Sequence, residues 1–417
     1  MAGTPLHGEF PTRRIFDETP ALPVGLTLDE RVFVIVIDGF GCGALPDAHE
    51  YGDSGANTVA NVAEAVGGIT VPGLRNLGLG NIVPIRGCPP AERPQACFGK
   101  MAEQAPAKDT MTGYWEMMGL RVEKTPRTFP DGFPPDLIDQ FQERCGRKVI
   151  GNKAASGTDI IEELGPRQLR TGELIVYTSV DSVFQVAAHT DVVSLEELHR
   201  CCKTARDMLT GDWAVGRVIA RPFRGEPGRF VRAADREDFA LAPPGRTVVD
   251  LAHERSMEVV SVGKVSNILA GRGFTQTIHT SSDSDGLEKT RELLSTRFAG
   301  LVLVNLVDLD TLYGHRNNSA GYARALSELD ADIRRTLEAR GARDMIVVTA
   351  DHGCDPTHPG TDHTREYVPL LVTGHSLKRG VDLGTRPTFA DVGATVAAYL
   401  GLEPPQRGTS FLEAIRS

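Results

Sequence analysis

Three runs of almost entirely apolar residues constrain the fold of this chain more than any other feature. They span residues 32–37, 301–307 and 345–349. Runs of this length without polar alternation are typical of strands that are buried on both faces of a parallel sheet. Strand and helix patterns also alternate from residue 258 to the C-terminus. The sequence therefore predicts an α/β core in which helices flank a largely parallel sheet.

Acidic and histidine residues follow the end of each run. The ones that we single out as candidate metal ligands are Asp38, Asp310, His315, Asp351, His352 and His363. Ligands of open α/β sheets bind beyond the carboxyl ends of the strands, so we expect these groups to converge on one site. Carboxylate and imidazole groups suit manganese, zinc or iron better than calcium. Six such ligands can hold two metal ions.

The alternative for any one of these residues is a charged, solvated loop. Asp310 and His315 are five residues apart in a stretch that we expect to form a loop. Asp355 and His358 are the weakest members of the last cluster, and we expect them to support ligands or to lie on the surface. It is the whole constellation, rather than any single member, that indicates metal binding.

The composition of the chain is that of a globular protein with a sizeable core. It has 417 residues, of which 41% are hydrophobic and 24% charged. The formal net charge of −10 disfavours nonspecific binding to nucleic acid or to anionic membranes. Seven cysteines without a CxxC pair indicate reduced thiols. We therefore expect a cytoplasmic protein that binds neither nucleic acid nor membrane and needs no obligate protein partner.

Two proline-rich stretches divide the chain, at residues 125–135 and 242–247. The segment between them has its own strand pattern at 174–179 and its own helix pattern at 195–198. We expect residues 125–241 to form an inserted α+β cap domain. All the candidate metal ligands lie outside this insert.

The remaining parts are assigned to a metal-binding core at 31–124 and 242–417 and to an irregular N-terminal arm at 1–30. The arm has four prolines and lacks the apolar centre of a signal peptide. The glycine-dense turn at 38–43 has GxGxG spacing and not the GxGxxG spacing of a dinucleotide loop, which argues against a nucleotide fold.

Thr110, in the segment 108–119, is the candidate nucleophile. A pair of metal ions can activate either water or a side-chain alcohol. A threonine that opens a helix is by default an N-cap, so the residue pattern alone leaves a purely structural role open.

Several longer motifs resemble those of the phosphopentomutase family in the alkaline phosphatase superfamily. The similarity runs from about residue 31 to the C-terminus. The motifs that carry it are residues 108–119, 155–158, 177–182, 216–223 and 360–367. The resemblance implies an alkaline-phosphatase-like core sheet and an inserted substrate-binding cap.

The resemblance also implies an activity, which is the interconversion of ribose 1-phosphate with ribose 5-phosphate and of their 2-deoxy forms. It implies two Mn²⁺ ions per chain, a phosphorylated threonine that matches Thr110, and glucose 1,6-bisphosphate or ribose 1,5-bisphosphate as activator. Asp38, Thr110, Asp351 and His352 would hold one metal, and Asp310, His315 and His363 the other. The positions that surround the sugar phosphate in the family are matched by Ser179, Asp181, Arg217, Ile219, Arg232 and Lys264.

Three positions depart from the family pattern. Gly39 stands where serine is expected, Tyr114 where histidine is common, and Cys354 where asparagine is usual. These departures bear on metal preference and pH optimum. The competing interpretations are a cofactor-independent phosphoglycerate mutase, a simple phosphomonoesterase, and a noncatalytic metal-binding protein. The ligand types leave Mn²⁺, Zn²⁺ and Mg²⁺ open as the bound metal.

Overall fold

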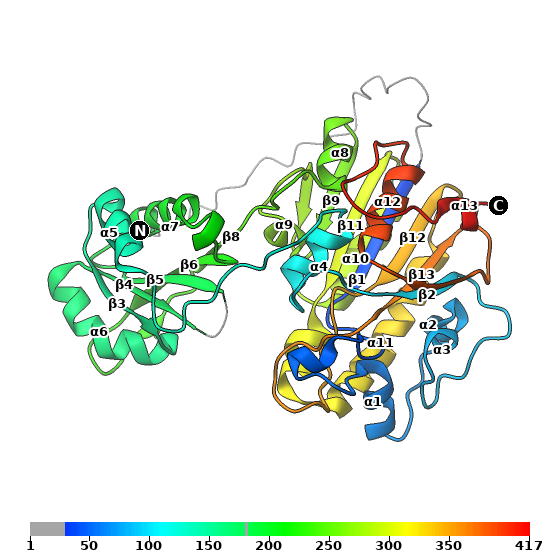
Figure 1. Cartoon of the computed structure of the whole chain (residues 1–417), viewed down its shortest axis with the longest axis horizontal. Coiled ribbons are helices and arrows are strands. Elements are labelled where there is room, and N and C mark those ends of the chain that lie inside the picture. The colour runs from blue at the N-terminus through cyan, green and yellow to red at the C-terminus, as the bar shows by residue number, and fades with distance from the viewer. Residues whose placement is uncertain (1–29, 180–181) are drawn as a thin grey trace, which may run out of the picture.

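The computed structural model describes residues 30–179 and 182–417 and contains two separate β-sheets (Figure 1). The predicted N-terminal arm, apart from its last residue, and the candidate residue Asp181 lie outside the described residues. None of the helices in the described ranges is both long and apolar enough to span a bilayer.

The larger sheet has eight strands in the order β10-β9-β11-β1-β12-β13-β2-β14. Their bounds are β1 Arg31–Ile37, β2 Cys97–Met101, β9 Glu258–Val262, β10 Gln276–Ile278, β11 Gly300–Leu306, β12 Asp344–Thr349, β13 Val368–Gly374 and β14 Asp382–Arg386. Strand β1 lies between β11 and β12 and is parallel to both. This confirms the three predicted strands and their parallel pairing. The sheet is mixed, since β13 pairs antiparallel with β12 and with β2.

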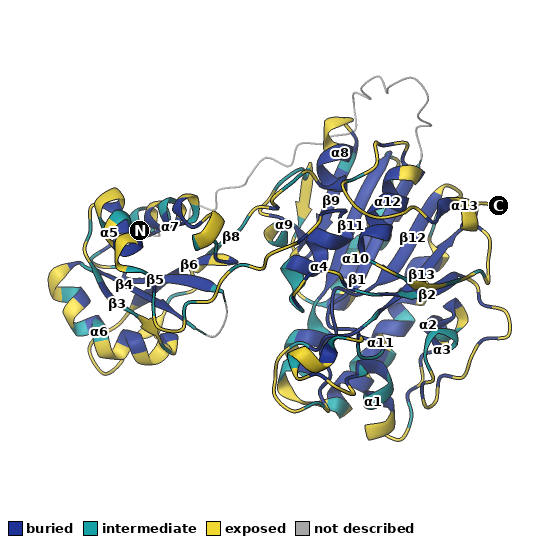
Figure 2. Cartoon of the chain, viewed as in Figure 1, coloured by how far each residue is buried: buried dark blue, intermediate teal, exposed yellow. Residues whose placement is uncertain are grey.

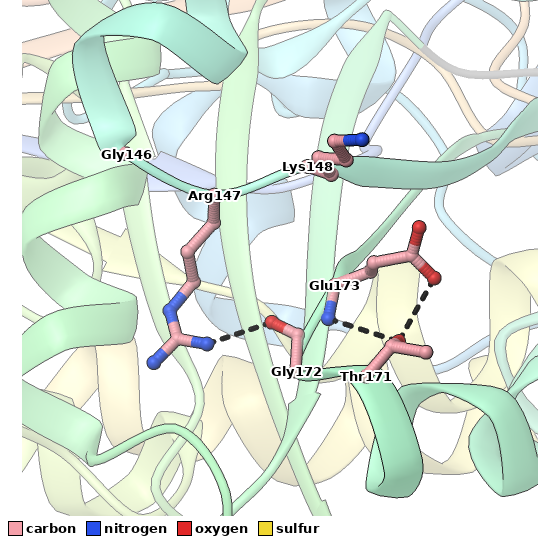
Figure 3. A pocket seen from close by; sticks show the side chains of 6 residues that line it. All are labelled: Gly146, Arg147, Lys148, Thr171, Gly172 and Glu173. Atoms are coloured by element: carbon pink, nitrogen blue, oxygen red, sulfur yellow. Dashed lines mark hydrogen bonds between the residues drawn. The ribbon is translucent and has the colours of Figure 1, made fainter.

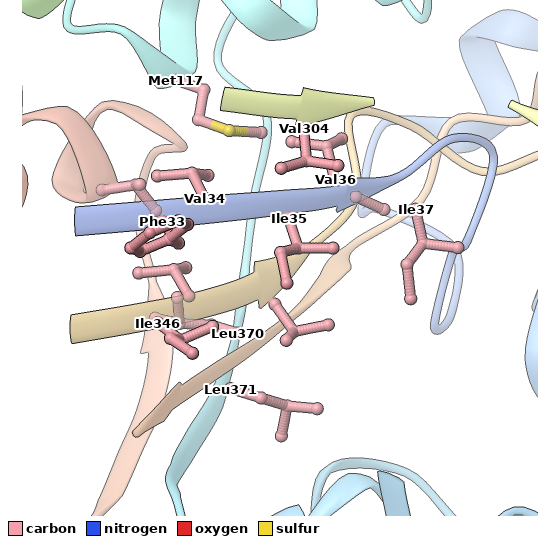
Figure 4. Close-up of a cluster of buried hydrophobic side chains, with 14 of the residues drawn as sticks. Phe33, Val34, Ile35, Val36, Ile37, Met117, Val304, Ile346, Leu370 and Leu371 are labelled. Atoms are coloured by element: carbon pink, nitrogen blue, oxygen red, sulfur yellow. The ribbon is translucent and has the colours of Figure 1, made fainter. Parts of the chain in front are cut away.

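All seven residues of β1 are buried, as expected for a central strand covered on both faces (Figure 2). Figure 4 shows the β1 side chains packed among Met117, Val304 and Leu370, which come from three other elements. Burying one Val, Ile or Phe side chain contributes about 1.5–3 kcal/mol. Because these contributions accumulate along the strand, the position of β1 in the sheet is strongly determined.

Helices pack on the large sheet in two groups (Figure 1). Helix α11 contacts α1, α2 and α10, whereas α12 contacts α4 and α8. The bounds are α1 Thr58–Ala65, α2 Pro72–Leu77, α3 Leu79–Ile82, α4 Thr110–Met117, α8 Val248–Glu254, α9 Val265–Ile268, α10 Asp283–Leu294, α11 Ser319–Glu338, α12 Ala390–Tyr399 and α13 Leu412–Ile415. The predicted fold class, an α/β core with flanking helices, is confirmed.

The smaller sheet belongs to a second, separately packed unit (Figure 1). Its order is β3-β4-β5-β6-β7, and β8 also pairs with β6. The bounds are β3 Val149–Ala154, β4 Leu174–Thr178, β5 Val183–His189, β6 Arg217–Arg224, β7 Val231–Arg232 and β8 Glu237–Ala240, with α5 Pro135–Cys145, α6 Gly157–Thr171 and α7 Leu195–Met208. Its apolar residues form two clusters of their own, apart from the core cluster of the large sheet. The domain boundaries at 125 and 241 stay a prediction.

A surface pocket of about 270 Å³ lies in this second unit (Figure 3). It is lined by Gly146, Arg147, Lys148, Thr171, Gly172 and Glu173. The Arg147 guanidinium there donates to the carbonyl of Gly172 and to Glu197. It is therefore already neutralised, and none of the candidate functional residues lines this pocket.

Candidate metal centre

Strand order brings the first candidate ligands together. Asp38 directly follows β1, and Asp351 and His352 follow β12, which is the neighbour of β1. All three side chains are almost fully buried. His352 Nε2 lies 3.3 Å from Asp38 Oδ1 and 3.4 Å from Asp351 Oδ2. The structure thus gathers two carboxylates and one imidazole at the carboxyl edge of the sheet.

Asp310 and His315 do not lie in a loop as predicted. Residues Leu309–Tyr313 form a π-helical turn, which continues into a 3₁₀ turn at Gly314–Arg316. Asp310 thus lies in the π-helical turn and His315 in the 3₁₀ turn that follows it. His315 Nε2 lies 3.2 Å from Asp310 Oδ2.

The three candidate histidines share one arrangement. In each of them Nδ1 lies within hydrogen-bonding distance of a backbone carbonyl, which can only accept, so Nδ1 carries the proton. Nε2 is then the ring nitrogen that is left to bind a metal, as is usual for ligating histidines. The pairs are His315 with Thr361 O at 2.6 Å, His352 with Gly353 O at 3.1 Å, and His363 with Lys108 O at 2.9 Å.

All three Nε2 atoms face the same cluster. His363 Nε2 lies 3.1 Å from His315 Nε2 and 3.6 Å from Asp310 Oδ1. The rings of His352 and His363 stack with centroids 3.7 Å apart. Three overlapping groups have ligand atoms within 4.8 Å of one another: Asp38 with Asp351 and His352, Asp310 with His352 and His363, and Asp310 with His315 and Cys354. The structure therefore brings all six predicted ligands to one place.

The carboxylate oxygens of the cluster give a second indication that it binds divalent cations. Asp38 Oδ1, Asp310 Oδ1 and Asp351 Oδ2 are buried, and within the described part of the chain none has a hydrogen-bond partner. Buried carboxylate oxygens are normally paired, because leaving one unpaired costs several kcal/mol. Three such oxygens facing imidazole nitrogens are the donor set that a manganese, zinc or iron ion takes.

The protonation equilibria reflect this crowding of charge. Burial, and then the charge of Asp38, raise the pKa of Asp351 well above its usual range. Burial opposes protonation of His352, but Asp351 and Asp38 outweigh it and raise the pKa of that imidazole. Burial, followed by the charge of His352, lowers the pKa of His363 to about 4. His363 is thus in the neutral form that binds metal at ordinary pH.

Thr110 is the first residue of α4, but it is not the helix cap. The Asp109 side chain takes that role by accepting from the backbone N–H groups of Met111 at 3.0 Å and Thr112 at 3.1 Å. The default interpretation of Thr110 as an N-cap is therefore wrong. Its Oγ1 instead lies 3.0 Å from His352 Nε2. The hydroxyl points at the ligand cluster from the start of a capped helix.

The candidate sugar-phosphate residues lie mainly on the second unit. Arg217 and Ile219 are alternate residues of β6 and share a face of the small sheet. Arg232 lies on β7, and Ser179 directly follows β4. Lys264 instead follows β9 of the large sheet. Among the described residues, no hydrogen bond or ion pair joins Arg217, Arg232 or Lys264 to the metal cluster.

Two residues that support the ligand cluster were not identified from the sequence. Asn305 Nδ2 donates to Asp38 Oδ2 at 3.0 Å and so orients that carboxylate. The sequence did contain a sign of this role, because Asn305 is the polar residue of an otherwise apolar strand. Glu366 is 2% exposed and accepts hydrogen bonds from Gly43 N, Thr58 N, Thr58 Oγ1 and Thr364 Oγ1. No local pattern distinguishes it from a surface glutamate.

Comparison with known proteins identifies the family. A family model described as the metalloenzyme superfamily matches residues 30–404. The phosphopentomutase of Carboxydothermus hydrogenoformans is 55% identical over 387 residues, which cover 93% of this chain and 100% of that protein. The chain belongs to the phosphopentomutase family. The predicted resemblance is thereby confirmed, and membership of a metalloenzyme superfamily agrees with the ligand groups above.

Other phosphopentomutases match almost as well. That of Anaeromyxobacter sp. strain K is 53% identical over 389 residues, again covering 93% of this chain and all of that protein. Among solved structures, the phosphoglycerate mutase of Leishmania mexicana is similar over 93% of this chain and 98% of that chain. Its TM-score is 0.45 and its identity 11%, so this likeness is too distant to bear on function.

Proposed function

We propose that this protein interconverts ribose 1-phosphate and ribose 5-phosphate, together with their 2-deoxy forms. The observation that carries the proposal is the position of Thr110, whose hydroxyl lies 3.0 Å from His352 Nε2 at the edge of the ligand cluster. Family membership supports it, since two relatives that share over half of their residues with this chain are phosphopentomutases. The enzyme would act in the cytoplasm on small sugar phosphates and without a protein partner.

Two Mn²⁺ ions would be held by the cluster. Asp38, Thr110, Asp351 and His352 would form one position, and Asp310, His315 and His363 the other. When bound, such a pair neutralises charge on the nucleophile and on the phosphoryl oxygens. Two observations support this assignment: three buried carboxylate oxygens have no hydrogen-bond partner in the described ranges, and the histidines share one orientation.

Thr110 would carry a phosphoryl group between the two sugar positions. Phospho-Thr110 transfers its phosphoryl group to the free hydroxyl of the sugar monophosphate, which gives a sugar bisphosphate. The other phosphate of the bisphosphate then returns to Thr110. Each transfer breaks one O–P bond and forms another, and the proton of the attacking hydroxyl ends on the oxygen that the phosphoryl group leaves. Glucose 1,6-bisphosphate or ribose 1,5-bisphosphate would supply the first phosphoryl group.

The second unit would act as a cap that binds the sugar phosphate and excludes water. Arg217 and Arg232 suit phosphate because a guanidinium offers a planar pair of donors. Arg232 has no ion-pair partner in the described ranges, whereas Arg217 has one distant partner, Asp238 at 3.8 Å. Ser179, Asp181, Ile219 and Lys264 complete the proposed set. Water must be excluded because it would otherwise hydrolyse phospho-Thr110.

The test is a coupled assay of ribose 1-phosphate conversion to ribose 5-phosphate with Mn²⁺, with and without glucose 1,6-bisphosphate. We expect activity that the bisphosphate stimulates. Release of inorganic phosphate without isomerisation would indicate a phosphomonoesterase, and turnover of 3-phosphoglycerate alone would indicate a phosphoglycerate mutase.

A matched pair of variants isolates the hydroxyl of Thr110. Thr110→Val keeps the shape of the side chain but lacks the hydroxyl, so we expect no mutase turnover. Thr110→Ser keeps a hydroxyl, so we expect measurable activity and a phosphorylated protein by mass spectrometry. Full activity of Thr110→Val would overturn the role of this residue.

A further inference from the structure

The sulfur of Cys354 lies inside the ligand cluster. Sγ of Cys354, a carboxylate oxygen of Asp310 and a ring nitrogen of His315 are all within 4.8 Å of one another. Metal–ligand bonds are about 2.0–2.3 Å for oxygen, nitrogen and sulfur, so atoms on opposite sides of one ion are separated by up to about 4.6 Å. The limit of 4.8 Å is close to this separation, so the three atoms are near enough together for one ion to bind between them with small shifts of the side chains.

The backbone holds the sulfur in this place. The Cys354 N–H lies 3.1 Å from both Gly39 O and Thr58 Oγ1, and the side chain is 1% exposed. Glycines make room on both sides, because a Cβ on Gly314 would lie 2.5 Å from Sγ and one on Gly39 would lie 2.9 Å from the Cys354 Cβ. A larger residue at Gly314 would therefore push the sulfur away from Asp310 and His315.

We propose that Cys354 supplies a thiolate ligand to the metal position formed by Asp310 and His315, and that this sulfur raises the affinity of the position for Zn²⁺ or Co²⁺ relative to its affinity for Mn²⁺. On binding, the ion replaces the thiol proton, which is released to solvent, and no oxidation state changes. Thiolates favour zinc and cobalt, whereas purely oxygen and nitrogen sites discriminate less against manganese. The inference rests on the proposed metal centre but not on the mutase reaction.

Asp310 Oδ1 supports this position independently of the cysteine. It is a buried carboxylate oxygen without a hydrogen-bond partner in the described part of the chain, and it faces the cluster. The other role open to Cys354 is that of a buried thiol that packs beside Asp310 without binding the ion. The two roles differ in whether a sulfur–metal bond forms, and spectroscopy detects that bond directly.

The experiment is titration of the full-length protein, stripped of metal by chelation, with Co²⁺ under reducing conditions. We expect a thiolate-to-cobalt charge-transfer absorption in the near ultraviolet for the wild-type protein. Cys354→Ser and Cys354→Asn should lack this absorption. Cys88→Ser is the matched control, because Cys88 is also 1% exposed but belongs to no ligand group in the described ranges, and it should keep the absorption.

Competition between Zn²⁺ and Mn²⁺ gives a second measure. Cys354→Asn should reduce the ratio of zinc to manganese affinity at this position by at least about tenfold. If the folded wild-type protein binds Co²⁺ without the charge-transfer absorption, the proposal is overturned, and this result does not depend on whether any variant folds. An unchanged affinity ratio in a folded Cys354→Asn protein would also overturn it.

These outcomes separate the inference from the proposed function. Charge-transfer absorption without mutase turnover would contradict the proposed function and support the sulfur ligand. Bisphosphate-stimulated mutase activity in a protein that lacks the absorption would support the proposed function and contradict the sulfur ligand.

Discussion

Replacing Glu366 by glutamine tests how the metal-bearing loop is held. Glu366 Oε2 accepts from Gly43 N at 3.0 Å and from Thr58 N at 2.9 Å. Oε1 accepts from the hydroxyls of Thr58 at 2.6 Å and Thr364 at 2.7 Å. All four partners are donors, and the carboxylate joins the segment after β1, the start of α1 and the residue after His363.

Each of the two hydroxyls already accepts one hydrogen bond and donates its own proton to Glu366, because a carboxylate oxygen can only accept. Thr58 Oγ1 already accepts from Cys354 N at 3.1 Å, and Thr364 Oγ1 accepts from Asp355 N at 3.2 Å. Each hydroxyl proton is therefore directed at Glu366. In Glu366→Gln the amide oxygen can replace Oε2, but the amide nitrogen then faces both hydroxyls, and their protons lose their acceptor.

The expected cost follows from these two lost bonds. A buried donor without an acceptor costs about 1–3 kcal/mol, so the substitution should lower the free energy of unfolding by about 4 kcal/mol within a range of about 2–6. A loss of that size is a large share of a typical stability of about 5–15 kcal/mol. Because Thr58 and Thr364 position Cys354 and Asp355, metal affinity should fall as well.

The assay is urea unfolding followed by circular dichroism, with metal affinity measured by isothermal titration. Glu288→Gln is the control, since Glu288 is exposed on α10 and should change stability by less than about 0.5 kcal/mol. If Glu366→Gln unfolds within about 1 kcal/mol of the wild-type protein and binds metal equally well, the directional hydrogen-bond argument is refuted.

Three further outcomes are expected. Burial and the charge of Asp308 raise the pKa of Asp283 to about 7. An unfolded aspartate has a pKa near about 3.9, so the folded state binds more protons between these values and stability should fall as pH rises through this window, by up to about 4 kcal/mol. Asp283→Asn should flatten that slope in urea unfolding measured from pH 4 to 8; an unchanged slope would contradict the assignment. Gly39→Ala should destabilise the fold by about 2–3 kcal/mol in the same assay, because Gly39 has a φ of +73° and an added Cβ would lie 2.9 Å from the Cys354 Cβ. An unfolding free energy equal to that of the wild-type protein would refute this. Removal of metal by chelation should lower the melting temperature and abolish turnover, and Mn²⁺ should restore both; a chelated protein that keeps full activity would show that no ion is needed.

The apolar runs were sufficient to predict the central strands, because a segment buried on both faces leaves a continuous pattern in the sequence. The order β11-β1-β12 then places the strand ends side by side. The geometry around Asp310 was not predictable in the same way. Whether five residues form a loop or a π-helical turn depends on what they pack against, and both give the same spacing of Asp310 and His315.

The capping of α4 shows a different limit. Asp109 and Thr110 are adjacent, and both residue types cap helices well. The hydrogen bonds of the structure distinguish them. The Asp109 side chain caps the helix, and the Thr110 hydroxyl lies beside His352. Glu366 was missed because three of its four hydrogen bonds come from Gly43 and Thr58, which are more than 300 residues away in the sequence. The metal ligands could be predicted because each follows a recognisable strand, whereas no such marker precedes Glu366.

The candidate nucleophile and the metal ligands belong to one network of contacts. His363 Nδ1 donates to the carbonyl of Lys108, two residues before Thr110, and Lys108 Nζ lies 3.4 Å from Asp362. Thr110 in turn contacts His352. The loop that follows β12 therefore fixes the start of α4 at two points. Since residues of one network are not energetically independent, substitutions in that loop and at Thr110 should combine non-additively. The position of the hydroxyl relative to the cluster is thus set by the metal loop as much as by the helix that carries it.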